Sequence, residues 1–270
     1  DLLTASEFMQ MKNDASLNDG GIPIYSQETI DDPPVDTDWL DQIFRTAPLQ
    51  SYDLSFSGGN ERTRYYVSGS YFDQEGIVLG TDFRKFGGRV NIDQKVSDRF
   101  TVSANFGVNR SINNRKEGDQ SLNGPVPNAL SLPPIYPVYN KDDSYSEAGP
   151  YANPVSIAEQ QINEAFSFRT LGNISLDYEI IDGLTFTSKL GYDMVNYREH
   201  SYDPASTRQG AKYNGVGLES TSEAIKMLFS NVLTYDMDIG ENNISLLGGV
   251  ELEQEKESYT YMRAQDYTSP

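Results

Sequence analysis

The sequence contains no cysteine, one tryptophan and one histidine among its 270 residues. Without cysteine the chain has no disulfide bond, no thiolate nucleophile and no cysteine ligand for a metal ion. It also lacks an uninterrupted apolar run of about 18 residues, which is the length that a membrane-spanning helix requires. These absences exclude a disulfide-stabilised fold, cysteine-based catalysis and a membrane-spanning helix within the chain.

Basic residues are also scarce, because 21 Lys and Arg stand against 40 Asp and Glu, for a formal net charge of −19. An acidic surface repels phosphate backbones, so we expect no nucleic-acid partner. Only 37% of the residues are hydrophobic, and 11% are aromatic. This composition favours a sheet with one polar face over a thick, wholly apolar core.

From residue 52 onward, apolar and polar residues alternate with a period of two, which predicts β-strands. In the clearest stretch Phe86, Val90 and Ile92 face one side of the predicted sheet, whereas Arg89 and Asn91 face the other. About eight such strands are present. Many run for about ten residues or more, against a usual length of about 5–6 in soluble sheets.

The predicted connections alternate between short and long. Short turns are expected near 58–61, 97–98, 182–183 and 239–242, and longer connections near 73–81, 111–165 and 198–217. This asymmetry is typical of an outer-membrane barrel, in which one strand face meets lipid and the other meets water. Tyrosines near strand ends suit an interfacial aromatic belt: Tyr52, Tyr71, Tyr178 and Tyr235. A soluble β-sandwich or lectin-like domain also alternates, but strand length and loop asymmetry favour the barrel.

The first 50 residues lack this period and are predicted to form a segment of loops and short helices leading into the barrel at residues 51–270. Thr4 and Glu7 have capping-box spacing, which predicts a helix near 5–15. Residues 16–37 are predicted to be loop. Asp38 is placed to cap a second short helix, whose apolar face would hold Trp39, Leu40, Ile43 and Phe44.

The long connection at 111–165 is predicted to be an extracellular loop with a helix of its own. Asn153-Pro154 marks the expected start of that helix. Its expected apolar face holds Ala158, Ile162 and Ala165.

Residues 36–106 closely resemble the SusC/RagA family of TonB-linked outer-membrane transporters of Bacteroidetes. The matching blocks are Asp38-Trp39, Ile43-Phe44-Arg45-Thr46-Ala47-Pro48, Ser57-Gly58-Gly59-Asn60, Tyr65-Tyr66-Val67-Ser68-Gly69, Gln74-Glu75-Gly76 and Asn91-Ile92-Asp93. The remaining strands fit this family mainly by their pattern.

The resemblance implies an integral transmembrane antiparallel β-barrel of 22 strands in the cell outer membrane, with a plug and a TonB-contact segment. It implies import of a glycan, oligosaccharide or peptide, energised through TonB, with a SusD-like surface lipoprotein as a lid. On this expectation the 270 residues are an internal segment of the early barrel, and the plug domain is absent from them. The alternative function is a soluble or surface-exposed β-rich glycan-binding module.

Several clusters contain residue types found in catalytic or metal sites, but none is assigned a catalytic, cofactor-binding or metal-binding role. The acidic group Asp31, Asp32, Asp36, Asp38 and Asp41, like Asp142, Asp143 and Glu147, is expected to be a solvated loop rather than a calcium site. His200 is expected in a loop without a nucleophile beside it.

Two further groups leave the substrate-binding residues unassigned. Carboxylates at alternate positions are expected to line a lumen or enter a loop: Glu251, Glu253, Glu255 and Glu257. The loop aromatics either stack on sugar rings or pack the loop on itself: Tyr136, Tyr139, Tyr145 and Tyr151.

Overall fold

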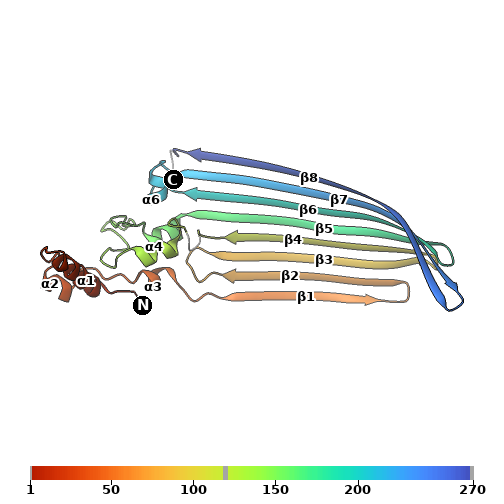
Figure 1. Ribbon diagram of the computed structural model, residues 1–270, viewed down its shortest axis with the longest axis horizontal. Helices are drawn as coiled ribbons and strands as arrows, with labels where there is room; N and C mark the ends of the chain where they lie inside the picture. Colours follow the sequence, from red (N-terminus) through yellow and green to blue (C-terminus); the bar gives the residue numbers. More distant parts are fainter. Residues whose placement is uncertain (1, 118–120, 268–270) are drawn as a thin grey trace.

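The computed structural model describes residues 2–117 and 121–267; residues 1, 118–120 and 268–270, which the predicted segments 1–50, 51–270 and 111–165 include, lie outside the described residues. Eight strands form one antiparallel sheet in which every strand pairs with its neighbours along the chain (Figure 1). The strands are β1 (Leu49–Gly59), β2 (Thr63–Glu75), β3 (Asp82–Ser97), β4 (Phe100–Asn114), β5 (Ile162–Ile181), β6 (Leu184–Asp203), β7 (Val216–Ile239) and β8 (Asn242–Gln265). The predicted all-β antiparallel fold is therefore confirmed.

The strands are long, from 11 residues in β1 to 24 in β8. Among the described residues β1 pairs only with β2 and β8 pairs only with β7, so the sheet is open at both edges. Every residue of these two edge strands is exposed. Because an edge strand presents unpaired backbone N–H and C=O groups, both edges can form hydrogen bonds with further strands.

Short turns join the strands at one end of the sheet, as predicted. The first turn differs in detail, because Gly58 and Gly59 pair with Tyr65 and Arg64 within the β1–β2 ladder. The turn itself spans residues 60–62, and the Asn60 side chain accepts hydrogen bonds from the backbone of Arg62 and Thr63, both at 2.9 Å. The turn is therefore formed by Asn60, whose side chain accepts hydrogen bonds from the following backbone, and not by the glycine pair.

Short helices gather at the opposite end of the sheet (Figure 1). They are α1 (Ala5–Asn18), α2 (Gln27–Asp31), α3 (Trp39–Ile43), α4 (Pro125–Ser131), α5 (Pro154–Gln160) and α6 (Arg208–Ala211). The capping box of Thr4 and Glu7 and the Asp38 cap are both present. None of the helices in the described residues is long and apolar enough to cross a membrane.

Some element boundaries predicted from the sequence are wrong. Residues 16–37 are not all loop, because they contain the end of α1 and all of α2, and α4 was not predicted. Ile162 and Ala165 belong to β5, because α5 ends at Gln160. Phe44 lies beyond α3 and forms an isolated bridge with Val78, so it does not share the apolar face of that helix.

The three long connections are shorter than predicted, at 76–81, 115–161 and 204–215. His200 accordingly lies in β6, paired with Glu219 of β7, and not in a loop. The strand ends near the helices carry polar residues on both faces, so no apolar alternation marks them in the sequence.

The largest buried cluster within residues 2–117 and 121–267 lies among the helices, not in the sheet. Trp39 and Ile43 of α3 pack against Ala129, Leu132 and Val155. The Trp39 indole N–H donates to the Pro133 carbonyl at 3.1 Å, which satisfies its one polar atom. We call α3 together with the described part of the connection 115–161, which contains α4 and α5, the cap.

Candidate functional site

One face of the sheet is apolar yet exposed to solvent in the isolated chain. Directly paired residues of an antiparallel sheet share a face, so the register assigns each side chain. This apolar face includes Leu54, Phe56, Val67, Val90, Ile92, Phe106, Ile174, Leu190, Met227, Phe229 and Leu252. All of these side chains are at least one-third exposed, with Leu54 at 63%. Exposed apolar surface on this scale marks a face that meets another apolar phase or partner.

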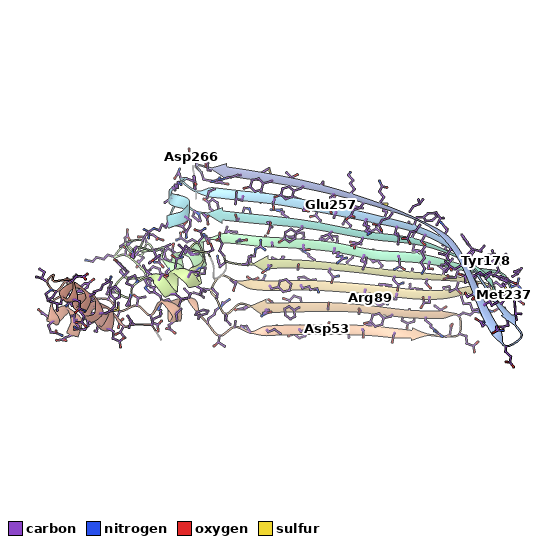
Figure 2. The ribbon with its side chains drawn as sticks, viewed as in Figure 1. Asp53, Arg89, Tyr178, Met237, Glu257 and Asp266 are labelled. Atoms are coloured by element: carbon purple, nitrogen blue, oxygen red, sulfur yellow. The ribbon has the colours of Figure 1, made fainter. Side chains whose placement is uncertain are left out.

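The opposite face is polar and carries ion pairs across neighbouring strands. Figure 2 labels Asp53, Arg89 and Glu257 from this polar face, and Tyr178 and Met237 from the apolar face. Further members of the polar face are Ser55, Ser68, Asn91, Asn105, Arg169, Asp193, Lys226 and Glu253. Arg169 donates two hydrogen bonds to Asp193, at 3.0 and 2.7 Å, and Lys226 pairs with Glu253 at 2.7 Å. The result is a hydrophilic wall in which some of the charges are held in ion pairs between neighbouring strands.

The four glutamates expected to line a lumen or enter a loop belong to a strand and not to a loop. Glu251, Glu253, Glu255 and Glu257 occupy alternate positions of β8 on the polar face. Because β8 is an edge strand, all four are exposed.

Aromatic rings border the apolar face at two levels. Near the cap, Tyr52 stacks on Tyr71 at 6.3 Å between ring centroids, and Tyr71 contacts Phe86 at 4.9 Å. Near the short turns, Phe100 packs against Tyr178 at 6.3 Å. Tyr235 pairs with Leu184 at the same end. The tyrosines predicted as a belt therefore divide between the two ends of the apolar face.

A pocket of about 260 Å³ lies on the polar face where β5–β8 approach the cap. Arg115 forms an ion pair with Glu199 and donates to the Asn163 side chain at 3.1 Å. Tyr259 and Tyr261, on alternate positions of β8, expose their rings beside this pair. A charged pair that donates and accepts, next to two flat aromatic faces, suits a polar ligand with an apolar side, such as a sugar or a peptide.

No pattern in the sequence predicts this pocket, which we call the mouth pocket. Arg115 directly follows a strand, and Glu199 lies 84 positions later, so no local spacing connects them. Only the pairing of β4 with β5 and of β5 with β6 brings the two side chains together.

The two ends of the connection 115–161 meet near Lys116. The Lys116 ammonium donates to the Gln161 carbonyl, and burial lowers its pKa to about 8 against a smaller opposing effect of the Asp203 carboxylate. Gly80 lies beside it with φ of 73°, where a Cβ atom would stand 2.1 Å from the Ala158 carbonyl oxygen. The connection 76–81 therefore passes the end of α5 at a distance that only glycine permits.

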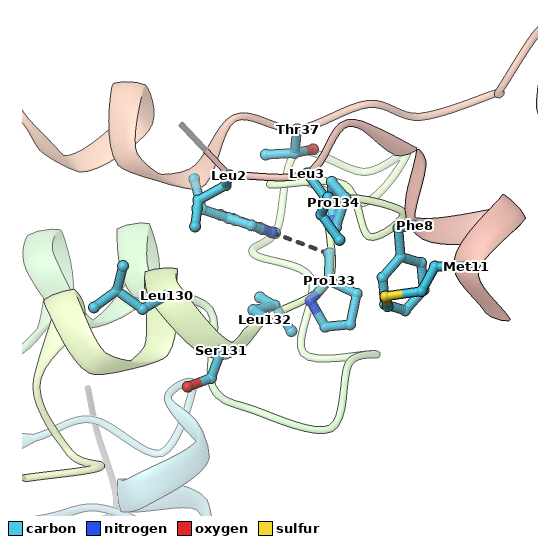
Figure 3. Close-up of a pocket in the computed structure, with 11 residues that line it drawn as sticks. Leu2, Leu3, Phe8, Met11, Thr37, Leu130, Ser131, Leu132, Pro133 and Pro134 are labelled. Atoms are coloured by element: carbon cyan, nitrogen blue, oxygen red, sulfur yellow. Dashed lines mark hydrogen bonds between the residues drawn. The ribbon is translucent and has the colours of Figure 1, made fainter. Parts of the chain in front are cut away.

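A second pocket, of about 220 Å³, separates the N-terminal helix from the cap (Figure 3). Leu2, Leu3, Phe8 and Met11 line it from the N-terminal segment, and Leu132 with Pro133 and Pro134 from the connection that follows α4. None of its lining residues is titratable, so it offers apolar contact and no acid–base chemistry.

Three of the acidic residues named as calcium candidates accept hydrogen bonds within local structure. Asp38 caps α3 through the backbone of Leu40 and Asp41. Asp36 accepts from the Ala5 backbone at 2.8 Å, and Asp142 accepts from the Ser144 hydroxyl at 2.6 Å. Within the described ranges no group of three or more acidic or histidine side chains is placed to hold a metal ion.

The four loop tyrosines divide between packing and exposure. Tyr136 and Tyr145 pack on the cap core, whereas Tyr139 and Tyr151 are more exposed. The Tyr145 hydroxyl donates to Glu159, and burial together with this hydrogen bond raises the pKa of Tyr145. The Tyr139 ring also contacts the Tyr145 ring, at 5.2 Å between centroids, so packing of the loop on itself accounts for three of the four rings.

Known proteins resemble the chain across nearly its whole length, although no family model matches it. TonB-dependent receptor P3 of Formosa agariphila is 30% identical over 277 residues, covering 98% of this chain and 25% of the relative. TonB-dependent receptor SusC of Bacteroides thetaiotaomicron is 26% identical over 242 residues, covering 80% and 24%. The chain therefore spans about a quarter of the length of these relatives.

The fold also has a counterpart among solved structures. The RagAB peptide transporter matches with a TM-score of 0.75 at 22% identity, over 99% of this chain and 34% of that one. At 22% sequence identity the match is evidence of a shared fold alone. It identifies the open eight-stranded sheet as the arrangement found in part of a larger transporter.

Proposed function

Because the homologues of this chain are TonB-dependent receptors, SusC among them, we propose that it forms part of the barrel wall of a SusC-like importer in the outer membrane. The proposed cargo is a glycan, an oligosaccharide or a peptide, and the relatives are receptors and transporters rather than enzymes. The observation that carries the proposal is the exposed apolar face, opposite a polar face that would line the lumen.

The height of the apolar face supports its placement in a bilayer. On the apolar face of β5, Phe168 lies towards the cap and Tyr178 lies towards the short turns. Ten residues along β5 separate them, which is about 34 Å of strand. Strands tilted by about 35–45° would give this stretch a height of about 24–28 Å, close to the roughly 25 Å apolar band of outer-membrane barrels.

The strand tilt itself is visible in the sequence pattern. On β1 the apolar positions begin at Tyr52. On β8 they begin at Leu252, which lies six residues nearer the short turns than the β8 residue in the same pairing row as Tyr52. Six residues are about 20 Å along the strand, against about 34 Å for seven strand spacings. A membrane plane that crosses the sheet in this way makes an angle of about 30° with the pairing rows, near the tilt of such barrels.

The two ends of the sheet then face different compartments. Short turns belong to the periplasmic side and long connections to the cell surface. The cap and α1 would therefore lie outside the cell, where a SusD-like lipoprotein would contact them. The plug, the TonB-contact segment and the other strands of a 22-stranded barrel are assigned to parts of the full-length protein outside these residues.

The alternative, a soluble glycan-binding module, is not favoured. A soluble sheet buries its apolar face against a second layer. Among the described residues, the helices gather beyond the end of the sheet and do not cover that face (Figure 1).

Uptake measurements test the proposal in cells that carry the full-length receptor. We expect labelled oligosaccharides or peptides to accumulate only when both the receptor and TonB are present. We also expect Glu199→Ala, which breaks the mouth-pocket ion pair, to lower uptake without lowering receptor abundance. Uptake that is unchanged after deletion of the receptor would count against the proposal.

A further inference from the structure

The apolar face carries a group of cations immediately above its aromatic upper border. Arg84 of β3 and Arg198 of β6 lie in one pairing row, with Ile112 and Phe166 between them. Arg110 lies in the next row down, level with Phe86 and Phe168. A pocket of about 370 Å³ opens here, lined by Arg110, Ile112, Glu164, Phe166, Asn196, Arg198 and His200.

The arginines differ in how far carboxylates compensate them. Arg84 lies 3.6 and 3.7 Å from Asp73 and Asp82. Glu219 accepts from Arg198 at 2.6 Å and is 2.8 Å from the His200 ring nitrogen, so one carboxylate contacts both side chains.

Arg110 is the least compensated of the three. Its guanidinium lies 5.2 Å over the Phe166 ring, and no carboxylate of the described residues lies within 4.0 Å of it. Glu164 is the acidic residue on the pocket wall, and Glu223 lies in the same row as Arg110, three strands away. Among the residues that the structure describes, Arg110 has no carboxylate within ion-pair distance, and the pair with Glu219 leaves other donors of Arg198 available.

We propose that this pocket binds the phosphate of a membrane lipid headgroup in the outer leaflet, an inference that rests on the proposed barrel placement. Planar guanidinium groups match phosphate oxygens in pairs, and Asn196 adds a side-chain amide donor. The half-buried rings and methyls of Phe166 and Ile112 form an apolar floor, continuous with the apolar face below. This combination suits a ligand with an anionic head and apolar tails.

The source of the phosphate is argued from charge and position. With a net charge of −19, the chain as a whole repels free anions. A lipid anchored in the adjacent leaflet is already held at the level of the pocket, so its effective concentration overcomes that repulsion. A phosphate dissolved in water has no such advantage.

The test uses the full-length receptor in detergent, titrated with bisphosphorylated lipid A and, separately, with dephosphorylated lipid A, with bound lipid counted by native mass spectrometry. Arg110→Gln and Arg198→Gln should each weaken binding of the phosphorylated lipid by about fivefold, as expected for loss of one basic residue at an anionic surface. Arg89→Gln, the same change on the polar face of β3, should leave binding within about twofold of the unmodified receptor.

Two further readouts separate this site from the import function and from free anions. Nutrient uptake should persist in both pocket variants, so loss of uptake without loss of lipid binding concerns the import proposal alone. Inorganic phosphate should not displace the lipid at equal concentration. Equal binding by both pocket variants and the unmodified receptor, or equal displacement by inorganic phosphate, would overturn the lipid site.

Discussion

The Lys116 ammonium group is largely buried in the cap. Burial lowers its pKa and the Asp203 carboxylate raises it, and the net effect on stability can be measured. Burial lowers the pKa of Lys116 to about 8 from an ordinary value of 10.5. Between those two pH values the unfolded chain binds a proton that the folded cap does not. Raising the pH through this window therefore stabilises the folded cap, and below about pH 8 the full cost of burying the charge is present.

We accordingly expect cap stability to rise between pH 8 and pH 10 in the unmodified receptor and to stay nearly level in Lys116→Met. The free energy of local opening, from hydrogen exchange of residues 124–160 corrected for the intrinsic rate, is the quantity to compare. Lys141→Met, which changes an exposed lysine of the same connection, is the matched control and should keep the pH dependence. A pH dependence that survives in Lys116→Met would remove this role from Lys116.

Residue-scale features of the mouth pocket and the cap were the least predictable from sequence. Asp38 and Thr4 were identified because their caps act within three residues. The Arg115–Glu199 pair and the Trp39–Pro133 hydrogen bond join positions 84 and 94 apart. Such contacts follow from strand order and from the packing of the helices, neither of which the local pattern contains.

Among the elements, α3 determines how the cap is held together, because Trp39 is almost completely buried at its centre. We expect Trp39→Ala to cost the cap about 3–5 kcal/mol, the usual result of emptying a large aromatic site. Limited proteolysis should then cut the connection 121–161 faster, while the strands remain protected. Leu122→Ala, at an exposed position of the same connection, should leave the cleavage rate unchanged.

Strand β3 offers a direct test of facing, because adjacent residues Val90 and Asn91 point to opposite faces. Val90→Arg places a cation in the apolar band and should destabilise the inserted barrel by about 2–4 kcal/mol. Asn91→Arg puts the same side chain on the polar face and should be tolerated. The amount of heat-modifiable, folded receptor in outer-membrane fractions measures both, and equal assembly of the two variants would refute the assigned faces.

Strand alternation was predictable because an apolar face and a polar face require opposite chemistry of successive residues. The prediction failed where that contrast ends. Near the cap, Glu164, His200 and Glu219 follow one another across three strands of the apolar side, so β6 and β7 extend into a stretch predicted as loop. Backbone pairing, which the sequence does not display, continues there without apolar periodicity.

For the whole molecule, the sheet is one long wall with a polar side, an apolar side and a capped end, matching part of a larger transporter in fold. Its open edges at β1 and β8 and its exposed apolar face are explained together if further strands continue the sheet and lipid covers that face. The central claim is that this apolar face contacts the hydrocarbon of the outer membrane.

Single-cysteine labelling tests that claim most directly, and these 270 residues contribute no competing cysteine. Val90→Cys and Asn91→Cys would each carry a fluorophore in the full-length receptor, reconstituted in bilayers that contain lipids with a quencher on the acyl chain. We predict strong quenching at position 90 and little at position 91, with water-soluble quenchers giving the reverse order. Equal quenching at both positions, or stronger lipid quenching at 91, would contradict the membrane placement.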